Sequence, residues 1–302
     1  MSASYNTETS RTSASLINTR FVKKVAQDKT AAENEGTAFI RSKMRQASFA
    51  REIIEPQLIS DDQFDKSTNL DMPRKIVELE PDSVATFVPF KGTGRRTWFR
   101  GKKYSIYFGK TESARFKKSK FELMTYENDI RKILSDNSVK DMADQEDIRF
   151  TDTLDAILTA NPGQVLTPAG GLTAANIADG FKNLVSRKIP IGKILMTKEL
   201  YYDALKLPAT SVGDIVASRH YDEGVESENH LWGFPVITTI KNDIIPNNHI
   251  YIFGPQNYLG NFYLLQDATL FIEQRADMIE FWSYAAPGIG IGNTRSITRI
   301  EL

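Results

Sequence analysis

Residues Tyr126–Ala160 read YENDIRKILSDNSVKDMADQEDIRFTDTLDAILTA and contain neither proline nor glycine. Apolar side chains recur here at helical spacing, and charged side chains fill the positions between them. We expect Thr125 or Asn128 to cap the start of a helix and Asn161-Pro162-Gly163 to end it. A continuous helix of this length would span about 50 Å, at 1.5 Å per residue. We call it the spine helix and expect the other parts of the chain to pack along it.

The apolar stripe of the spine helix is interrupted once. Between Asp136 and Lys140 the apolar positions slip out of line with those on either side. Because a helix can bury only one continuous face, we expect a kink or a break in this interval.

The overall composition excludes several classes of protein. The 302-residue chain can bury a sizeable core, and we expect two subdomains. Its 38 Lys and Arg balance its 38 Asp and Glu, so net charge does not argue for a nucleic-acid or membrane partner. The absence of cysteine excludes disulfides and thiolate chemistry. Without a long apolar stretch, we expect neither a transmembrane helix nor a secretory signal.

The first part of the chain is polar. Residues 1–35 include ten Ser and Thr and few large apolar side chains, a composition that does not fold alone. A short apolar patch that includes Phe21 and Val22 offers a surface for docking. The segment is therefore either a disordered tail or an arm that docks on a partner. After it, residues 36–54 are expected to form one helix, which Pro56 ends.

Residues 75–121 change to a β-rich pattern in which side chains alternate between apolar and polar. KGTGRR, residues 91–96, is typical of a turn and divides the segment into two strands. We therefore expect a long two-stranded ribbon just ahead of the spine helix. Because an isolated ribbon is only marginally stable in water, this one needs a surface to lie on.

Charge separates the ribbon from the spine helix. Residues 91–120 contain eleven Lys or Arg and a single acid, Glu112, whereas residues 122–160 contain ten acids and four bases. The two segments could neutralise each other within one chain. The basic ribbon of one subunit could instead lie across the acidic spine of its neighbour. A third interpretation is nucleic-acid binding, with Trp98, Phe99 and Tyr104 as stacking groups.

The second half of the chain predicts an α/β unit. A helix over residues 172–187 with Thr173 as its cap, a buried strand over 193–197 and a short helix over 198–207 follow one another. Residues 207–232 are expected to form an exposed polar loop. Short strands then continue to a terminal strand.

No arrangement of residues predicts catalysis, a metal or a cofactor. His220, His230 and His249 lack partners at ligand-like spacing. Gly288-Ile289-Gly290-Ile291-Gly292 resembles a phosphate-binding loop only superficially, because no helix follows it. The carboxylates of the spine helix are expected to face solvent. No nucleophile, base and oxyanion donor come together, so we expect a protein that is not an enzyme.

The order of these parts resembles that of a known family. GTAFIRSKMRQASFAREIIEP (36–56) is similar to its helix after the N-terminal arm, and FELMTYENDIRKILSDNSVKDMADQED (121–147) to its junction of extended loop and spine. FWSYAAPGIGIGNTRSITRIEL (281–302) is similar to its closing strand. The sequence resembles the major capsid protein of tailed double-stranded DNA bacteriophages, with the Hong Kong 97-like fold.

The resemblance implies an α+β fold with a defined layout. It comprises an N-terminal arm (1–36), the first part of a peripheral domain (37–74), an extended β-hairpin loop (75–121), the spine helix of the peripheral domain (122–165), an α/β axial domain (166–272) and closing peripheral strands (273–302). It further implies pentamers and hexamers in an icosahedral virion shell, assembled in the host cytoplasm around double-stranded DNA. Scaffolding, portal and decoration proteins would be further partners, without a membrane or a cofactor.

The same resemblance selects candidate contact residues. Those for contact with neighbouring subunits are Arg95, Arg96, Trp98, Phe99, Arg100, Lys102, Lys103, Tyr104 and Phe108 of the ribbon, with Phe21 and Val22 of the arm. Their expected acidic partners on the spine are Asp136, Asp141, Asp144, Glu146 and Asp147. Some members of the family cross-link a lysine of the extended loop, for which Lys102 and Lys103 are candidates by position.

Two alternatives stay open. One is the shell of an encapsulin-type nanocompartment, which shares the fold but encloses enzymes. The other is a nucleic-acid-binding module that uses the basic segment 91–120, for which binding would depend strongly on salt.

Overall fold

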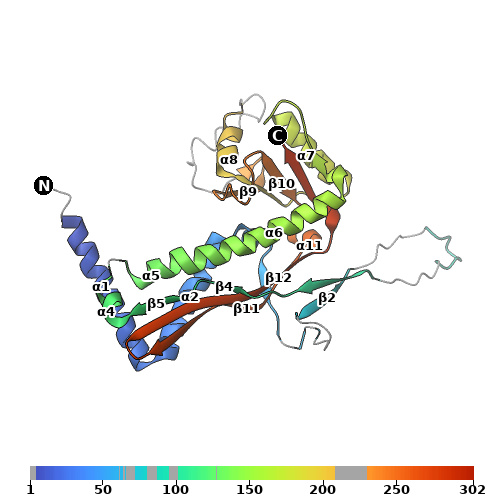
Figure 1. The fold of residues 1–302 in the computed structure, drawn as a ribbon. Helices are drawn as coiled ribbons and strands as arrows, with labels where there is room; N and C mark the ends of the chain where they lie inside the picture. The colour runs from blue at the N-terminus through green and yellow to red at the C-terminus, as the bar shows by residue number, and fades with distance from the viewer. Residues whose placement is uncertain are drawn as a thin grey trace.

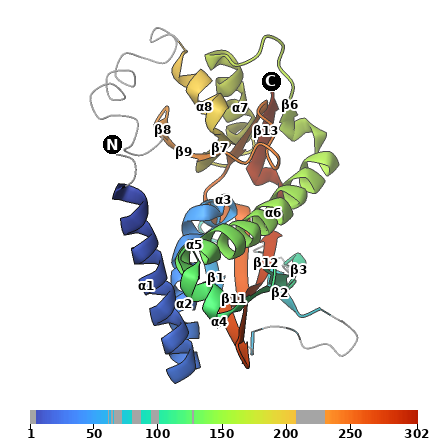
Figure 2. The ribbon, with the colours of Figure 1, turned by 60° about the vertical axis from the view of Figure 1, so that its left-hand side comes forward.

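The computed structural model describes residues 5–60, 62, 63, 65, 72–79, 87–94, 101–126, 128–207 and 230–302, with the backbone alone for 5–13. A long helix runs through the centre of the molecule (Figure 1). One sheet lies along it, and a second sheet with its own helices stands at its C-terminal end (Figures 1 and 2). The fold therefore mixes helices and sheets, as the sequence predicts.

The spine helix has the predicted interruption. Helix α5 (Ile130–Ile133) leads into a π-helical turn over Leu134–Val139, and α6 (Lys140–Ala160) continues to the expected end. The extra residue of a π-turn lets the apolar stripe shift and still face one core.

The predicted cap of the spine helix is wrong. Asp129 caps it by accepting a hydrogen bond from the N–H of Lys132 at 2.8 Å. Thr125 cannot do so because it ends a separate helix, α4 (Lys120–Thr125), where its hydroxyl donates to the carbonyl of Phe121.

The N-terminal segment is helical where it is described, which corrects the interpretation of it as a disordered tail. Helices α1 (Tyr5–Gln27), α2 (Lys29–Ala47) and α3 (Phe49–Ile53) replace the expected arm and the single helix over 36–54. Asp28 caps α2 and Ser48 caps α3. Helices of modest propensity form when tertiary packing covers one face, which composition alone does not reveal.

Helix α1 is joined to the start of the spine helix by a buried polar side chain. Asn18 accepts a hydrogen bond from the N–H of Ile130 at 2.8 Å and donates one to the carbonyl of Asn128 at 3.0 Å. It is completely buried. The spine helix thus obtains a partner for one of its free N-terminal N–H groups from another helix.

The first sheet contains the two longest strands. β11 (Gly260–Arg275) and β12 (Met278–Ile291) form an antiparallel hairpin, and β1 (Pro56–Leu58) pairs with β11. On the other side, β4 (Thr111–Glu112) and β5 (Phe116–Ser119) pair with β12. The strand order is β1-β11-β12-β4, with β5 also on β12.

Helix α2 covers the edge of β11 that β1 leaves free. The hydroxyl of Thr37 and the carboxylate of Glu33 accept hydrogen bonds from the N–H groups of Leu270 and Ile272, at 3.0 and 2.9 Å. Arg41 donates to the carbonyl of Ala268 at 2.9 Å. Side chains of the helix therefore satisfy a strand edge that would otherwise be open to another chain.

The second sheet forms the α/β unit. Its strands are β6 (Val165–Leu166), β7 (Lys193–Thr197), β8 (His230–Leu231), β9 (Phe234–Thr239), β10 (His249–Phe253) and β13 (Ile297–Glu301), in the order β6-β13-β10-β7-β9-β8. Helices α7 (Ala174–Ser186) and α8 (Lys198–Leu205) pack with it (Figure 2). Thr173 caps α7, as predicted. Short helical turns occupy Pro162–Gln164, Gln256–Leu259 (α11) and Thr294–Ser296.

The sheets divide the chain differently from the predicted domain boundaries. Residues 260–272, expected in the axial domain, belong to β11 and lie in the first sheet. Strand β13, expected to close the peripheral domain, lies in the second sheet between β6 and β10. Of the loop expected over residues 207–232, residues 208–229 lie outside the described chain.

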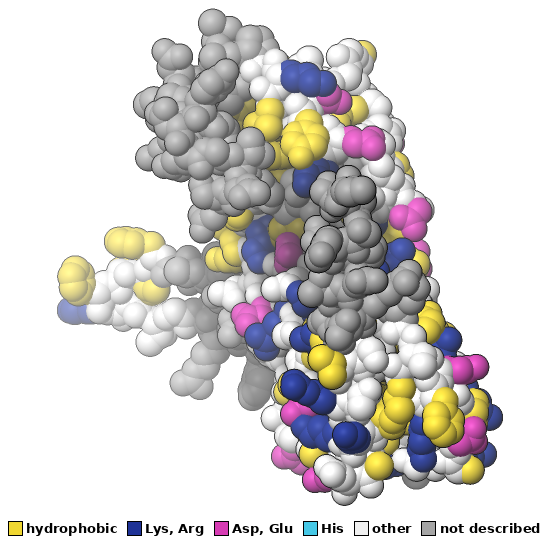
Figure 3. All heavy atoms as spheres, turned by 90° about the vertical axis from the view of Figure 1, so that its left-hand side faces the viewer, with side chains coloured by type: hydrophobic (Ala, Val, Ile, Leu, Met, Phe, Trp, Pro, Cys, Tyr) yellow, Lys and Arg dark blue, Asp and Glu magenta, His cyan; other side chains and the backbone are white. Residues whose placement is uncertain are grey.

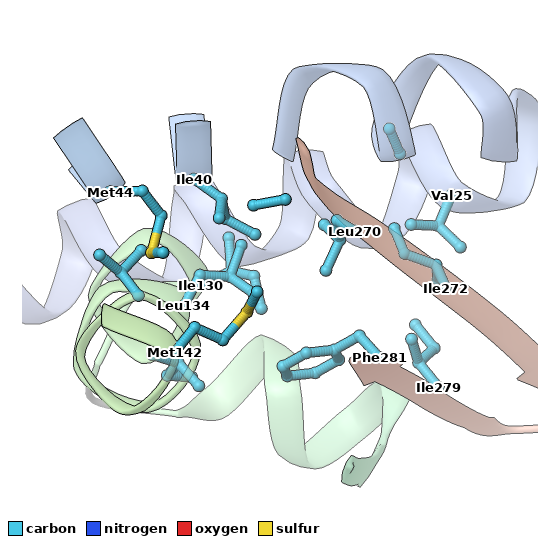
Figure 4. Packing of buried hydrophobic residues seen from close by; sticks show 14 of the residues in the cluster. Val25, Ile40, Met44, Ile130, Leu134, Met142, Leu270, Ile272, Ile279 and Phe281 are labelled. Atoms are coloured by element: carbon cyan, nitrogen blue, oxygen red, sulfur yellow. The ribbon is translucent and has the colours of Figure 1, made fainter. Parts of the chain in front are cut away.

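The main core of the first sheet lies where α2, the spine and the β11–β12 hairpin meet. Met44 of α2, Met142 of α6 and Phe281 of β12 approach one another there (Figure 4). Each is at most 1% exposed. This core holds the first sheet in place beside the spine helix.

Candidate assembly interface

The predicted ribbon is present and projects from the body. β2 (Arg74–Glu78) pairs with β3 (Lys103–Tyr107) in antiparallel register, from Arg74 opposite Tyr107 to Glu78 opposite Lys103. In Figure 1 β2 and β3 lie beside the right-hand end of β12, and residues 87–94 lie farther out to the right. Residues 111–119, expected in the same ribbon, instead belong to the first sheet as β4 and β5.

The tip of the ribbon, residues 87–94, is exposed and begins with the apolar run Phe87-Val88-Pro89-Phe90. Phe87 and Phe90 have relative exposures of 103% and 111%. A turn over residues 89–92 is closed by a hydrogen bond from the N–H of Gly92 to the carbonyl of Pro89 at 2.7 Å. In Figure 3 the tip is the projection on the left, where hydrophobic side chains gather.

Phe87 and Phe90 were not among the candidate residues predicted from the sequence. The signal was available, because Phe-Val-Pro-Phe directly precedes the turn-forming Lys91-Gly92-Thr93-Gly94. Large apolar side chains beside the turn of a solvent-exposed ribbon lack a core of their own and point to an interaction surface.

The root of the ribbon is held by a small core. Ile106 and Phe108 are 1% and 2% exposed, and they cluster with Ile59 and Tyr263. Phe108 is therefore not available to a neighbouring subunit, which corrects its prediction as a contact residue. Tyr104 is also half-buried by its own chain, and its hydroxyl accepts a hydrogen bond from Asn261 at 3.1 Å.

The other predicted ribbon residues divide into two groups. Lys102 and Lys103 are exposed, and Lys103 lies 3.5 Å from the carboxylate of Glu78 across the ribbon. The remainder lie outside the described residues, namely Arg95, Arg96, Trp98, Phe99 and Arg100.

The two predicted arm residues pack within the subunit. Val22 is 4% exposed and belongs to the core that contains Leu123 and Ile130, while the half-buried Phe21 packs against the same core. The burial of Val22 within its own subunit therefore contradicts its prediction as a contact for a neighbour.

Two of the predicted acidic partners on the spine helix are fully buried. Arg51 of α3 donates two hydrogen bonds of 2.7 Å to the carboxylate of Glu146 and one of 3.2 Å to Asp267. Burial raises the pKa of Glu146, and the hydrogen bond and charge of Arg51 oppose this rise. The expectation that Glu146 faces solvent is wrong because its cation comes from a helix distant in sequence.

Asp147 is also fully buried, on the adjacent side of the spine helix. Its carboxylate accepts hydrogen bonds from the hydroxyl of Ser48 at 2.8 Å and the N–H of Ala50 at 3.0 Å, and it pairs with Lys241. Lys241 also lies 2.9 Å from Asp144. Asp147 is therefore unavailable to the ribbon of another subunit.

Asp136 and Asp141 are exposed, as predicted. Because Glu146 and Asp147 are neutralised internally, the acidic surplus on the surface of the spine helix is smaller than the sequence count indicates. Bases of the ribbon segment are also paired within the subunit: Lys110 and Arg115 bind Glu112 at 2.8 and 3.0 Å. Charge alone is therefore a weak basis for contact between the two segments.

A metal site and a membrane-spanning helix each have requirements that the described residues do not meet. Within the ranges that the structure describes, no group of three or more His, Cys, Asp and Glu side chains is placed to hold a metal ion. No helix in the same ranges has the length and apolar character needed to cross a membrane.

Comparison with solved structures identifies the fold. The mature capsid of bacteriophage PhiM1 matches with a TM-score of 0.55 at 11% identity, over 84% of this chain and 87% of that one. A structure from Mycobacterium phage Cain matches with a TM-score of 0.56 at 10% identity, over 85% and 90%. A virus-like particle from Pyrococcus furiosus matches with a TM-score of 0.50 at 13% identity, over 89% and 98%.

The similarity is confined to structure. No family model matches the sequence, and no curated protein matches it. The chain has the fold of phage capsid proteins at an identity too low to establish more than that fold.

Proposed function

We propose that this protein is the major capsid subunit of a tailed phage and assembles into an icosahedral shell around double-stranded DNA. The observation that carries the proposal is the ribbon, which holds Phe87 and Phe90 away from the body of a subunit that has a capsid fold. Each ribbon tip is then buried on a neighbouring copy, and repetition of this contact builds pentamers and hexamers.

The energetics favour apolar burial over charge pairing. Burying one phenylalanine side chain contributes about 1.5–3 kcal/mol, whereas an exposed ion pair contributes about 0–1 kcal/mol. Contact between copies through Phe87 and Phe90 therefore dominates, and Lys102 and Lys103 with exposed acids such as Asp136 and Asp141 set orientation. The ribbon bases that are outside the described residues add to the same contact.

A nanocompartment is the second candidate, favoured by the structural match to the Pyrococcus furiosus virus-like particle. The nucleic-acid-binding module gains less support. Two of its bases are engaged with aromatic rings of the same chain: Arg115 lies 4.7 Å from the ring of Trp282, and Lys118 lies 4.2 Å from that of Tyr126.

Electron microscopy of the purified chain tests the proposal. We expect closed shells of uniform diameter, because a contact repeated between identical subunits at a suitable fixed angle closes on itself. A solution that contains only single subunits at high concentration would contradict it. In particles from the natural source, nuclease-protected double-stranded DNA is the expected content, and an enzyme cargo would instead establish the nanocompartment.

A further inference from the structure

The glycine-rich segment of β12 has a use that its sequence does not disclose. Gly288 and Gly290 of β12 and Gly292 just after its end are spaced by two residues, so all three present the same face. That face lies under β3, at the root of the ribbon. We call these three residues the glycine track.

Side chains of β3 and of the residue after it occupy the space that β-carbons of the track would fill. A β-carbon at Gly288 would lie 2.7 Å from the ring of Phe108, and one at Gly290 would lie 2.6 Å from Cδ1 of Ile106. At Gly292 the distance to the ring of Tyr104 would be 2.9 Å. All three are shorter than the roughly 3.5–4.0 Å of a normal carbon contact.

The two strands are in register across this contact. Tyr104, Ile106 and Phe108 are spaced by two residues, as are the three glycines, and they meet in antiparallel order. The next position continues the order, because the N–H of Gly109 donates to the carbonyl of Pro287 at 3.2 Å. A side chain on the track would have to displace these side chains. Because Ile106 and Phe108 are buried in the small core at the root, we expect their displacement to move β3 away from β12.

We propose that the glycine track fixes the angle at which the ribbon leaves the subunit and thereby the curvature of the shell. This inference rests on the proposed function. In a contact that joins different surfaces of identical subunits, the angle between successive copies decides whether the assembly closes and at what size. The ribbon carries that contact at its tip, far from the track that orients it.

A simple lever shows the size of the effect. A methyl group at Gly290 must lift Ile106 by about 1 Å to restore a normal contact. Because a strand rises about 3.3 Å per residue, Tyr104 lies about 6.6 Å away, and the lift tilts β3 by about 9°. The 10 residues from the fixed point at Tyr104 to Gly94 span at most about 33 Å, so the tip moves by at most about 5 Å.

The test is Gly290→Ala in the full chain, with spin labels on cysteines that replace Thr93 at the tip and Asp152 on the spine helix. The natural chain has no cysteine, so both labels attach only where intended. We expect the distance between labels to shift measurably, by up to about 5 Å, and the particles to change in diameter or stay open. Unchanged distances and diameters would overturn the inference.

Two further variants distinguish a change in the direction of the ribbon from a loss of stability of the subunit. Gly290→Ala with Ile106→Ala removes the colliding side chain, so the original distance and diameter should return. Gly163→Ala is the matched control, because a β-carbon there meets no atom within 4 Å. If neither Gly290 variant folds, the track serves folding rather than direction and the inference is wrong. If the natural chain forms no shell, the proposed function fails, while the label distances still test the track.

Discussion

Replacing Phe87 and Phe90 together by serine is expected to stop shell assembly while leaving the subunit folded. Both side chains are fully exposed, so the folded subunit loses no buried contact when they are removed. In a shell each would be buried on a neighbour, and the pair would contribute about 3–6 kcal/mol per subunit. At 1.4 kcal/mol per tenfold change, the critical concentration for assembly should rise by about 10²- to 10⁴-fold.

The matched control keeps the apolar character of the tip. Phe87→Leu with Phe90→Leu should assemble at a concentration much closer to that of the natural chain. Thermal unfolding should be the same for unassembled subunits of all three proteins. Light scattering over a concentration series measures the threshold. Assembly of the double serine variant at the natural threshold would show that the tip is not the contact.

Replacing Arg51 by alanine is expected to give the largest loss of subunit stability. The side chain of Arg51 is 2% exposed and that of Glu146 is completely buried. Breaking a buried pair by removing one partner leaves an uncompensated charge and costs about 3–5 kcal/mol. Urea unfolding of unassembled subunits measures the loss. Arg275→Ala, which removes a solvent-exposed partner of Glu273, is the control and should change stability little.

The loss of unfolding free energy in Arg51→Ala should depend on pH. Burial already raises the pKa of Glu146, and loss of Arg51 removes the opposing charge. The pKa in the folded state then lies further above the unfolded value of about 4.3, so the folded state binds a proton more readily. Stability of the variant relative to the natural chain should therefore recover as the pH falls from 8 toward 5. A deficit that is constant over this range would exclude Glu146 as its cause.

Local patterns predicted the spine helix well. The slip of its apolar stripe near Asp136 correctly indicated a break, because the 3.6-residue period of a helix leaves little freedom in where apolar residues fall. The structure resolves the slip as a π-turn over Leu134–Val139. The cap was harder to predict, because Asp129, Asn128 and Thr125 are all good caps and the sequence does not show that Thr125 belongs to the separate helix α4.

Non-local partners could not be predicted from the same patterns. Glu146 and Asp147 look like surface charges on a helix, since their cations Arg51 and Lys241 come from segments about 95 positions away. Likewise, the Ser- and Thr-rich composition of the first 35 residues indicated a tail, but Asn18 and a few apolar side chains suffice to dock α1 on the spine.

At the assembly interface, some features could be predicted from local patterns and others could not. Alternation predicted the ribbon, because a two-residue period is a local property of strands. Phe108 was assigned to a neighbour although its own subunit buries it, and Phe87 and Phe90 were overlooked. The purpose of Gly288-Ile289-Gly290-Ile291-Gly292 emerges only when β3 is seen to cross it, since the matching spacing of Tyr104, Ile106 and Phe108 lies far away in the sequence.

The account depends on the ribbon tip of one copy lying on another copy. Incorporating a photo-reactive phenylalanine analogue at Phe90 and assembling particles from equal amounts of ¹⁴N- and ¹⁵N-labelled subunits tests this directly. After illumination, mass spectrometry of the cross-linked peptides should show mixed-isotope pairs, as contact between copies requires. Cross-links found only within peptides of one isotope would place the tip on its own subunit and contradict the account.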